Sequence, residues 1–384
     1  MSPSRPPFAR AVAPVPTSGD AESDLATVEE SLRVVARSVG LLGAATPVDA
    51  HVERARLLAD YGAGRERLPV WAYAATSTEH RHSRGLRVLD AMEMPLRAID
   101  AMPVGPLYRE RALELRRELE AASVVGTSRF AHCAAVRFAP SAEQSRADAL
   151  AREWAREPRT PADAASSTLA SDDRDPRSLV SRLRAEVARR RLPFAVRTSA
   201  SMSALAAISG DTLWVAEGRR LAARDIERTV VHEIEAHAVP RMRARTLPVG
   251  IFAIGTAGGS DDQEGYALWL EETRGVSGVE RRRELGARHE AVSLMRSGAD
   301  FVAVVRALRD LEVVLETALR IAERAFRGSD GRTPGLGRER VYLEAYVRVQ
   351  GCLSRSPADE AVLGAGQVSV RAIDVLRPWV RELA

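Results

Sequence analysis

Two histidines and a glutamate in the stretch VVHEIEAH constrain this chain more than any other feature. His232 and His237 are five residues apart, and Glu233 directly follows the first histidine. Imidazole nitrogens on one helix, with a glutamate beside them, are typical of a catalytic zinc site. The stretch therefore predicts that the chain folds around a metal ion and brings a further ligand to it from elsewhere.

The spacing of the two histidines predicts an irregular helix. Ligands four residues apart differ by about 40° around an α-helix, whereas His232 and His237 would differ by about 140°. A turn widened by one residue, as in a π-bulge, or an unwound turn before Pro240, would bring both imidazoles to one side. We expect Asp225 to cap the start of this helix and Pro240 to end it.

A second glutamate-bearing segment follows the histidine pair. The passage GTAGGSDD is rich in glycine and turns the chain back, and Glu264 opens the amphipathic run EGYALWLEET. Glu264 is therefore the expected third metal ligand. Glu271 and Glu272 are alternatives, and either could instead orient a ligating imidazole through a hydrogen bond.

Glu233 has the position of a general base. A zinc-bound water needs a carboxylate within hydrogen-bonding reach to take its proton during attack on a carbonyl. Glu235 is the rival candidate. Because it lies two residues further along the helix, we expect its side chain to point away from the metal.

The segments before the histidine pair predict the fold class. PFAVRTS (193–199) and DTLWVAEG (211–218) are rich in apolar and β-branched residues, which is typical of strands. We expect an α+β, predominantly helical fold, with a zincin-like metallopeptidase core and a small sheet beside the HExxxH helix. The edge of such a sheet can hold an extended peptide by backbone pairing.

Helical periodicity predicts most of the remaining structure. The segment 77–85 is polar, so we expect a solvated loop containing His80 and His82, while His132 should be a packed or capping residue rather than a ligand. The apolar spacing predicts amphipathic helices at 24–39, 47–61, 106–122, 179–191, 299–327 and 367–384.

Composition shifts divide the chain into four parts. Residues 1–24 are rich in proline and are expected to form a disordered tail. Residues 25–156 form an N-terminal helical region, and 157–176, rich in Pro, Ser, Ala and Asp, form a loop or linker. Residues 177–384 are then the zincin-like catalytic region.

Charge and apolar content exclude several classes of function. All 56 basic residues are arginines, which removes lysine chemistry, and they alternate with acids to leave a net charge of only +4. This pattern predicts no nucleic-acid partner. The absence of a long uncharged apolar run predicts no membrane span. Two distant cysteines and a proline-interrupted N-terminus favour a cytoplasmic protein without disulfides.

The motifs HEIEAH and GTAGGSDDQEGYA resemble the family described by its QEGLA motif, which was once linked by name to flavohaemoglobin expression. Its animal members include the microtubule-associated tyrosine carboxypeptidases, which remove the C-terminal tyrosine of α-tubulin. The likeness continues through LPVWAY, PLYRERALELRREL and GRERVYLEA. It implies a zinc metallopeptidase with ligands His232, His237 and Glu264 and with Glu233 as the catalytic glutamate.

The sequence thus predicts a zinc metallo-carboxypeptidase acting on the C-terminus of a peptide or protein, and the resemblance favours an aromatic terminal residue. Arg241 or Arg338 could bind the terminal carboxylate through a bidentate pair, and Tyr342 could stabilise the oxyanion. Two alternatives remain open. One is a zinc-stabilised regulatory or binding protein without catalysis, and the other is an endopeptidase or amide hydrolase.

Overall fold

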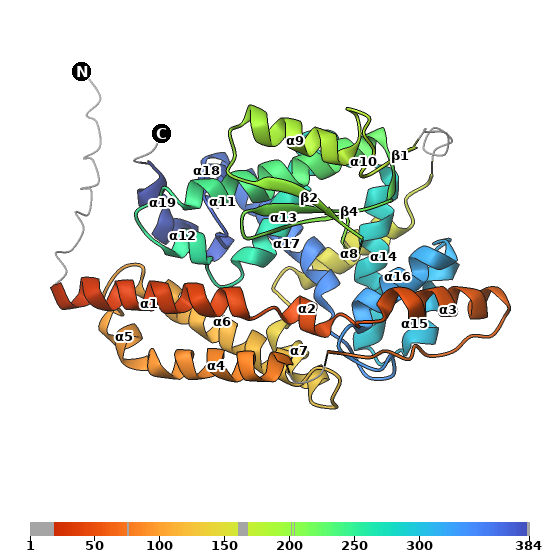
Figure 1. Ribbon diagram of the computed structural model, residues 1–384, viewed down its shortest axis with the longest axis horizontal. Coiled ribbons are helices and arrows are strands. Elements are labelled where there is room, and N and C mark those ends of the chain that lie inside the picture. Colours follow the sequence, from red (N-terminus) through yellow and green to blue (C-terminus); the bar gives the residue numbers. More distant parts are fainter. Residues whose placement is uncertain (1–18, 75–76, 160–167, 201, 203, 382–384) are drawn as a thin grey trace, which may run out of the picture.

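A computed structural model describes residues 19–74, 77–159, 168–200, 202 and 204–381. Helices predominate in this part of the chain, and the strands are few and short (Figure 1). The expected α+β, predominantly helical fold class is therefore confirmed. None of the helices in the described residues is long and apolar enough to cross a membrane.

The first half of the chain is helical up to the strands. The helices before the strands are α1 (Gly19–Ser38), α2 (Leu41–Ala45), α3 (Ala50–Gly62), α4 (Ser77–Ala91), α5 (Glu93–Ala98), α6 (Gly105–Ser123), α7 (Phe130–Arg137) and α8 (Gln144–Ala155). The strands are β1 (Thr168–Ala170), β2 (Ala195–Ser199), β3 (Ala206–Ser209), β4 (Thr212–Ala216) and β5 (Arg220–Ala222), with α9 (Leu179–Arg189) between β1 and β2.

The second half is helical again. The α-helices are α10 (Ala223–Val230), α11 (Val239–Ala244), α12 (Ile251–Ile254), α13 (Gly259–Thr273), α14 (Val279–Arg296), α15 (Phe301–Asp310), α16 (Leu315–Phe326), α17 (Val341–Arg355), α18 (Glu360–Leu363) and α19 (Ile373–Arg381). A π-helix, η2 (Val231–Ala238), joins α10 to α11, and short 3₁₀ turns are η3 (Arg338–Arg340), η4 (Pro357–Asp359) and η5 (Val370–Ala372).

The strands form two small sheets. One has the order β2-β4-β3, with β2 parallel and β3 antiparallel to the central β4, and the other pairs β1 with β5 in antiparallel fashion. The two strands expected from the sequence, at 193–199 and 211–218, are β2 and β4. The other three were missed because each is a short segment without a β-branched run.

The helix that bears the histidines packs against the three-stranded sheet. Leu213 and Val215 of β4 are buried together with Leu183 of α9 and with Ile226 and Ile234 of the following helix. Figure 1 shows α9 and α10 lying beside this sheet. Because side chains alternate across a strand, the apolar residues of β4 fix the position of the helix at the sheet.

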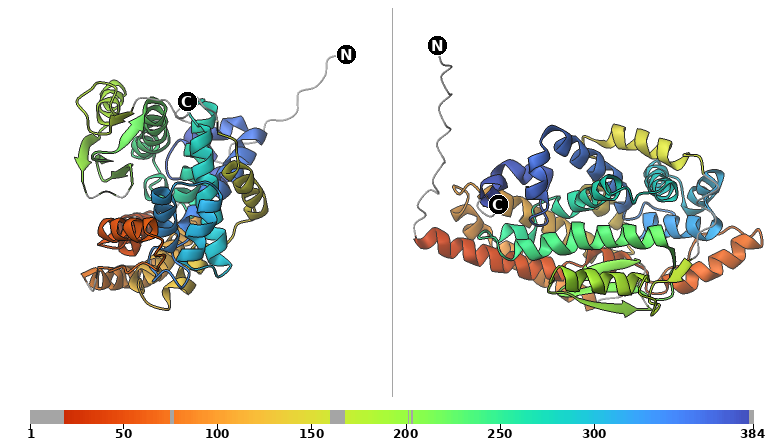
Figure 2. Two further views of the ribbon diagram at one scale, coloured as in Figure 1. Left: turned by 90° about the vertical axis from the view of Figure 1, so that its right-hand side faces the viewer. Right: turned by 90° about the horizontal axis from the view of Figure 1, so that it is seen from above.

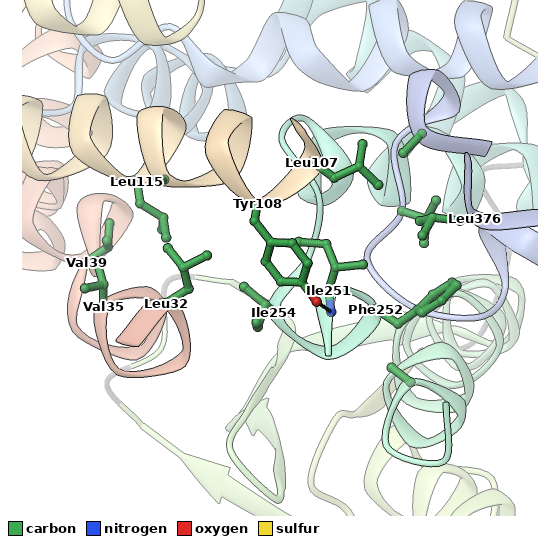
Figure 3. Close-up of a cluster of buried hydrophobic side chains, with 14 of the residues drawn as sticks. Leu32, Val35, Val39, Leu107, Tyr108, Leu115, Ile251, Phe252, Ile254 and Leu376 are labelled. Carbon is green, nitrogen blue, oxygen red and sulfur yellow. Dashed lines mark hydrogen bonds between the residues drawn. The ribbon is translucent and has the colours of Figure 1, made fainter. Parts of the chain in front are cut away.

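The N-terminal helices share an apolar core with the C-terminal half. Leu32 of α1 and Leu115 of α6 pack in the same cluster as Phe252 of α12. Figure 3 shows Tyr108 inside this cluster, where its hydroxyl accepts a hydrogen bond from the Ile251 backbone N–H at 3.1 Å. Figure 2 shows that α1 runs along one side of the molecule, parallel to its long axis.

The helix with the histidines has different limits from those expected. It starts after Ala222, so Asp225 lies in its first turn and pairs with Arg228 rather than capping it. The expected end at Pro240 is also wrong, because α11 continues to Ala244. Pro240 falls in the first turn of α11, directly after the π-helix, where a missing backbone N–H is tolerated.

The segment 77–85 is a helix and not the expected solvated loop. It forms the first part of α4, and His82 is buried with its Nε2 atom 3.2 Å from the Val39 carbonyl oxygen. His82, Leu86 and Leu89 lie at helical spacing, a periodicity that the polar residues around them obscure. The structure describes the backbone of His80 but not its side chain.

Three other boundaries are corrected. Residues 19–24 of the expected tail belong to α1, while 1–18 lie outside the described residues. The expected loop at 157–176 contains β1, and the expected helix at 299–327 is divided into α15 and α16. Glu312, between these two helices, has a φ of 60°, and this left-handed conformation ends α15 without a glycine or proline to signal it.

Candidate metal centre

The two histidines lie on the π-helix η2, and this confirms the predicted widening of the turn. A π-helix closes its hydrogen bonds over five residues instead of four, so residues five apart come to one face. The ring centroids of His232 and His237 are accordingly 4.9 Å apart. The π-helix thus accommodates the one extra residue between His232 and His237, and the helix is not unwound.

Helix α13 brings Glu264 to the histidines. This helix begins at Gly259, one turn earlier than expected, so Glu264 lies in its second turn. The nearest donor atoms of His232, His237 and Glu264 all lie within 4.8 Å of one another. Gly265 allows this arrangement, because a Cβ atom there would be 2.4 Å from the backbone of Ala345 on α17.

The two ring nitrogens of His232 have different partners. Nδ1 donates to Glu271 Oε1 at 2.8 Å, and Nε2 lies 3.5 Å from Glu264 Oε2. Burial lowers the pKa of His232, but the bonds to Glu264 and Glu271 outweigh it and raise the pKa to about 10. Glu271, one of the alternatives for the third ligand, therefore contacts the imidazole on the side away from Glu264.

The two oxygens of Glu264 are also divided between two partners. Oε2 faces His232, while Oε1 accepts from Arg338 Nη2 at 3.1 Å. Burial raises the pKa of Glu264, but the hydrogen bond with His232 and the charge of Arg338 hold it well below its usual value. The carboxylate is therefore ionised and has one oxygen directed at the imidazole nitrogens.

The donor set fits a zinc ion. His232 presents Nε2 because Glu271 occupies Nδ1, and Glu264 presents Oε2 because Arg338 occupies Oε1. Two imidazole nitrogens and one carboxylate oxygen are a ligand set found in catalytic zinc sites, where a fourth position stays open for water or substrate. Among the described residues, His232, His237 and Glu264 are the group of His, Cys, Asp and Glu side chains that could hold a metal.

Glu233 and Glu235 have different surroundings. Glu233 is only 7% exposed, and the contacts found among the described residues give its carboxylate no hydrogen bond or ion pair. Glu235 accepts from Arg190 at 3.0 Å and from Arg274 at 3.1 Å. Glu235 is therefore held by arginines outside the donor set, whereas Glu233 keeps its lone pairs available.

The residues expected to bind substrate lie in two places. Arg338 binds Glu264, and its Nη1 is 3.3 Å from the Tyr342 hydroxyl, so both lie beside the donor set. Arg241 is held elsewhere, with Nη1 3.4 Å from the carbonyl oxygen of Ile208 on β3. The structure thus brings Arg338 and Tyr342 to Glu264 and places Arg241 at the outer strand of the sheet.

Glu272, the other alternative ligand, faces a different part of the molecule. Its Oε1 is 3.7 Å from Arg282 Nη1. Glu272 also lines a cavity of about 490 Å³ together with Trp154 and Tyr346. This cavity lies between α8, α13, α14 and α17, and the three donor residues do not line it.

A buried arginine near the site was missed by the sequence analysis. Arg281 of α14 binds both oxygens of Glu271, from Nε at 3.0 Å and from Nη2 at 3.1 Å. It lies in the run VERRRELGARHE, which has the charge pattern of a solvated surface helix. Because every basic residue of the chain is an arginine, no signal in the sequence separates the buried arginines from the exposed ones.

Comparison with known proteins identifies the family. The model of the microtubule-associated tyrosine carboxypeptidase family matches residues 63–382, which include all three donor residues, Glu233 and Arg338. No curated protein matches the chain in a sequence comparison. The match covers well over half of the 384 residues and agrees with the resemblance found in the motifs. The chain belongs to the microtubule-associated tyrosine carboxypeptidase family.

Proposed function

We propose that this protein is a zinc-dependent metallo-carboxypeptidase with a zincin-like core, which hydrolyses the C-terminal peptide bond of a peptide or protein. The observation that carries the proposal is the group of His232, His237 and Glu264 donor atoms within 4.8 Å of one another. The family match supports a carboxypeptidase-type reaction. The preference for an aromatic terminal residue rests on the name of the family alone.

The chemistry is divided among few groups. A zinc ion held by His232, His237 and Glu264 supplies a Lewis acid for the scissile carbonyl and for a water molecule. Glu233 takes the proton of the attacking water and returns it to the leaving amine. Its burial without a contact to an arginine among the described residues supports this role, because a carboxylate tied to an arginine would be a poorer base.

Arg338 is the stronger candidate for binding the terminal carboxylate. It reaches Glu264 and Tyr342 at once, so a carboxylate bound to its guanidinium group would lie next to the metal. Its planar fork suits a carboxylate in a bidentate pair. Tyr342, 3.3 Å from Arg338, is then placed to donate to the oxyanion. Arg241 is the second candidate, since β3 can pair with an extended substrate.

The proposal can be tested on the purified full-length chain. We expect one zinc ion per chain by elemental analysis and release of the terminal residue from peptides ending in Tyr, Phe, Ala and Lys. The same peptides with an amidated C-terminus should be cleaved far less, because the arginine loses its charged partner. Arg338→Met should remove this discrimination, whereas Arg241→Met should keep it if Arg338 alone binds the carboxylate.

Two results would overturn the proposal. Zinc bound at full occupancy without release from any peptide would favour the zinc-stabilised regulatory protein. Equal cleavage of free and amidated peptides would favour the endopeptidase or amide hydrolase. His237→Ala is the control for the metal site, because a variant that retains all of its zinc would show that the ion binds elsewhere.

A further inference from the structure

We propose that Arg281 is a positioning residue of the metal centre, which acts on His232 through Glu271. This inference rests on the proposed zinc site. Arg281 on α14, Glu271 on α13 and His232 on the π-helix contact one another in series. Arg281 binds Glu271 with two nitrogens, and Glu271 binds His232 Nδ1.

Both oxygens of Glu271 accept hydrogen bonds. Oε1 accepts from His232 at 2.8 Å and from Arg281 Nη2 at 3.1 Å, while Oε2 accepts from Arg281 Nε at 3.0 Å. The Glu271 side chain is 1% exposed and that of Arg281 is 12% exposed. The carboxylate therefore cannot rotate without breaking at least one of these contacts, and water has little access to replace them.

The fixed carboxylate in turn fixes the imidazole. With Nδ1–H donated to Glu271, the neutral ring that a metal ion would bind carries its lone pair on Nε2, the nitrogen that faces Glu264. Without such a partner an imidazole turns freely about its last torsion and can exchange its two nitrogens. Residues that orient a metal-binding histidine in this way typically change metal affinity by about 10- to 100-fold when they are replaced.

The adjacent pair, Glu272 and Arg282, lies on the same two helices but does not contact His232. Glu272 and Arg282 are the next residues on the same two helices, yet their closest charged atoms are 3.7 Å apart. Arg282 instead binds Glu157 at 2.7 Å, on the side away from the histidines. Only the inner of the two adjacent pairs therefore reaches the imidazole.

A second pair on α13 provides a matched control. Arg348 of α17 binds Asp262 at 2.7 Å, and the Asp262 side chain is also almost fully buried. This pair ties α13 to a neighbouring helix just as Arg281 does, but within the described residues Asp262 contacts Arg348 and the Val370 backbone N–H and not a histidine. Loss of Arg348 should therefore disturb the packing of α13 without releasing His232.

The test is the dissociation constant for zinc, measured by chelator competition on the full-length protein. We expect Arg281→Met to weaken zinc binding about tenfold and Arg281→Lys to weaken it less, because one ammonium group can still hold Glu271. Arg348→Met should change it by no more than about twofold.

The outcomes separate this inference from the proposed function. Folded Arg281→Met protein with unchanged zinc affinity would overturn the positioning role and leave the zinc site intact. Equal losses in Arg281→Met and Arg348→Met would also overturn it, because they would indicate a general loosening of α13. If Arg281→Met does not fold, Glu271→Gln applies the same criterion with less change in volume. Wild-type protein that binds no zinc would instead refute the proposed function.

Discussion

Two parts of the interior are built in opposite ways. Between the N-terminal helices, Leu32, Leu115 and Leu119 pack in an apolar cluster. Beyond Glu271 and Arg281, the interior contains ion pairs, above all Glu339 with Arg288 at 2.7 Å and with Arg324 at 2.9 Å. We call Glu339, Arg288 and Arg324 the ionic interior. Apolar packing stabilises the fold but is not directional. Paired charges hold their side chains in defined orientations, but their burial carries a high desolvation cost.

The apolar cluster and the ionic interior respond differently to substitution. An apolar cluster tolerates exchange of one side chain for another of similar volume. Buried ion pairs contribute little net stability, but removal of one partner leaves an uncompensated charge. The ionic interior lies beside Arg338, which directly precedes Glu339 in η3 and binds Glu264. We therefore expect the apolar part to carry stability and the ionic part to carry the geometry of the site.

The largest effect is expected from Glu339→Leu. Glu339 is 2% exposed and forms ion pairs with two arginines, so its loss leaves Arg288 buried without its closest acid. The free energy of unfolding should fall by about 4 kcal/mol, measured by urea denaturation at neutral pH. A loss below about 1 kcal/mol would show that water reaches the arginines. It would contradict the difference between the apolar cluster and the ionic interior.

Leu115→Ala should have the next largest effect. Leu115 is fully buried between α1 and α6, and its truncation should cost about 3 kcal/mol by the same measurement. Zinc affinity should stay unchanged, since no ion pair of the site is involved. A parallel loss of zinc affinity would contradict the division of tasks between the two parts.

Gly265→Ala tests the contact where the helix bearing Glu264 meets α17. A Cβ atom would be 2.4 Å from the Ala345 backbone, so the helices must separate and stability should fall by about 2 kcal/mol. Zinc affinity should fall with it, because Glu264 moves with α13. Gly43→Ala is the control, since a Cβ there has no neighbour within 4 Å, and it should stabilise α2 by about 0.5 kcal/mol.

The smallest effect is a change in pH dependence. Burial raises the pKa of Glu339, but Arg288 and Arg324 outweigh it and lower the pKa to about 2. Because the pKa in the unfolded chain is near the ordinary value of 4.5, stability from this group is present above pH 4.5 and is lost as pH falls towards 2. Glu339→Gln should flatten this part of the stability profile. An unchanged slope would show that Glu339 does not titrate in this way.

The sequence predicted those parts of the fold that depend on local patterns. The spacing of His232 and His237 predicted either a π-type widening or an unwound turn before Pro240, and the structure has the π-helix. Strands β2 and β4 were predicted from the apolar and β-branched residues of their segments. The break between α15 and α16 could not be predicted, because it depends on the left-handed backbone of Glu312 and not on a glycine or proline.

The sequence pointed to the donor residues of the candidate site, but not to the arginines that hold its carboxylates. Glu264 could be selected from its motif, and the structure places it with the two histidines. The contacts of Arg281 and Arg338 with carboxylates depend on how α13, α14 and η3 pack, which no local pattern specifies. Arg241, the arginine shortly after the second histidine, lies on α11 and contacts the Ile208 carbonyl oxygen of β3.

The central claim is tested most directly by Glu233→Gln at matched zinc content. Both wild type and variant should bind one zinc ion per chain, because Glu233 is not among the donor residues. The account predicts that the wild type releases the terminal residue and that the variant is slower by about 100-fold or more. A variant that releases the residue as fast as the wild type, with the same zinc content, would contradict the account.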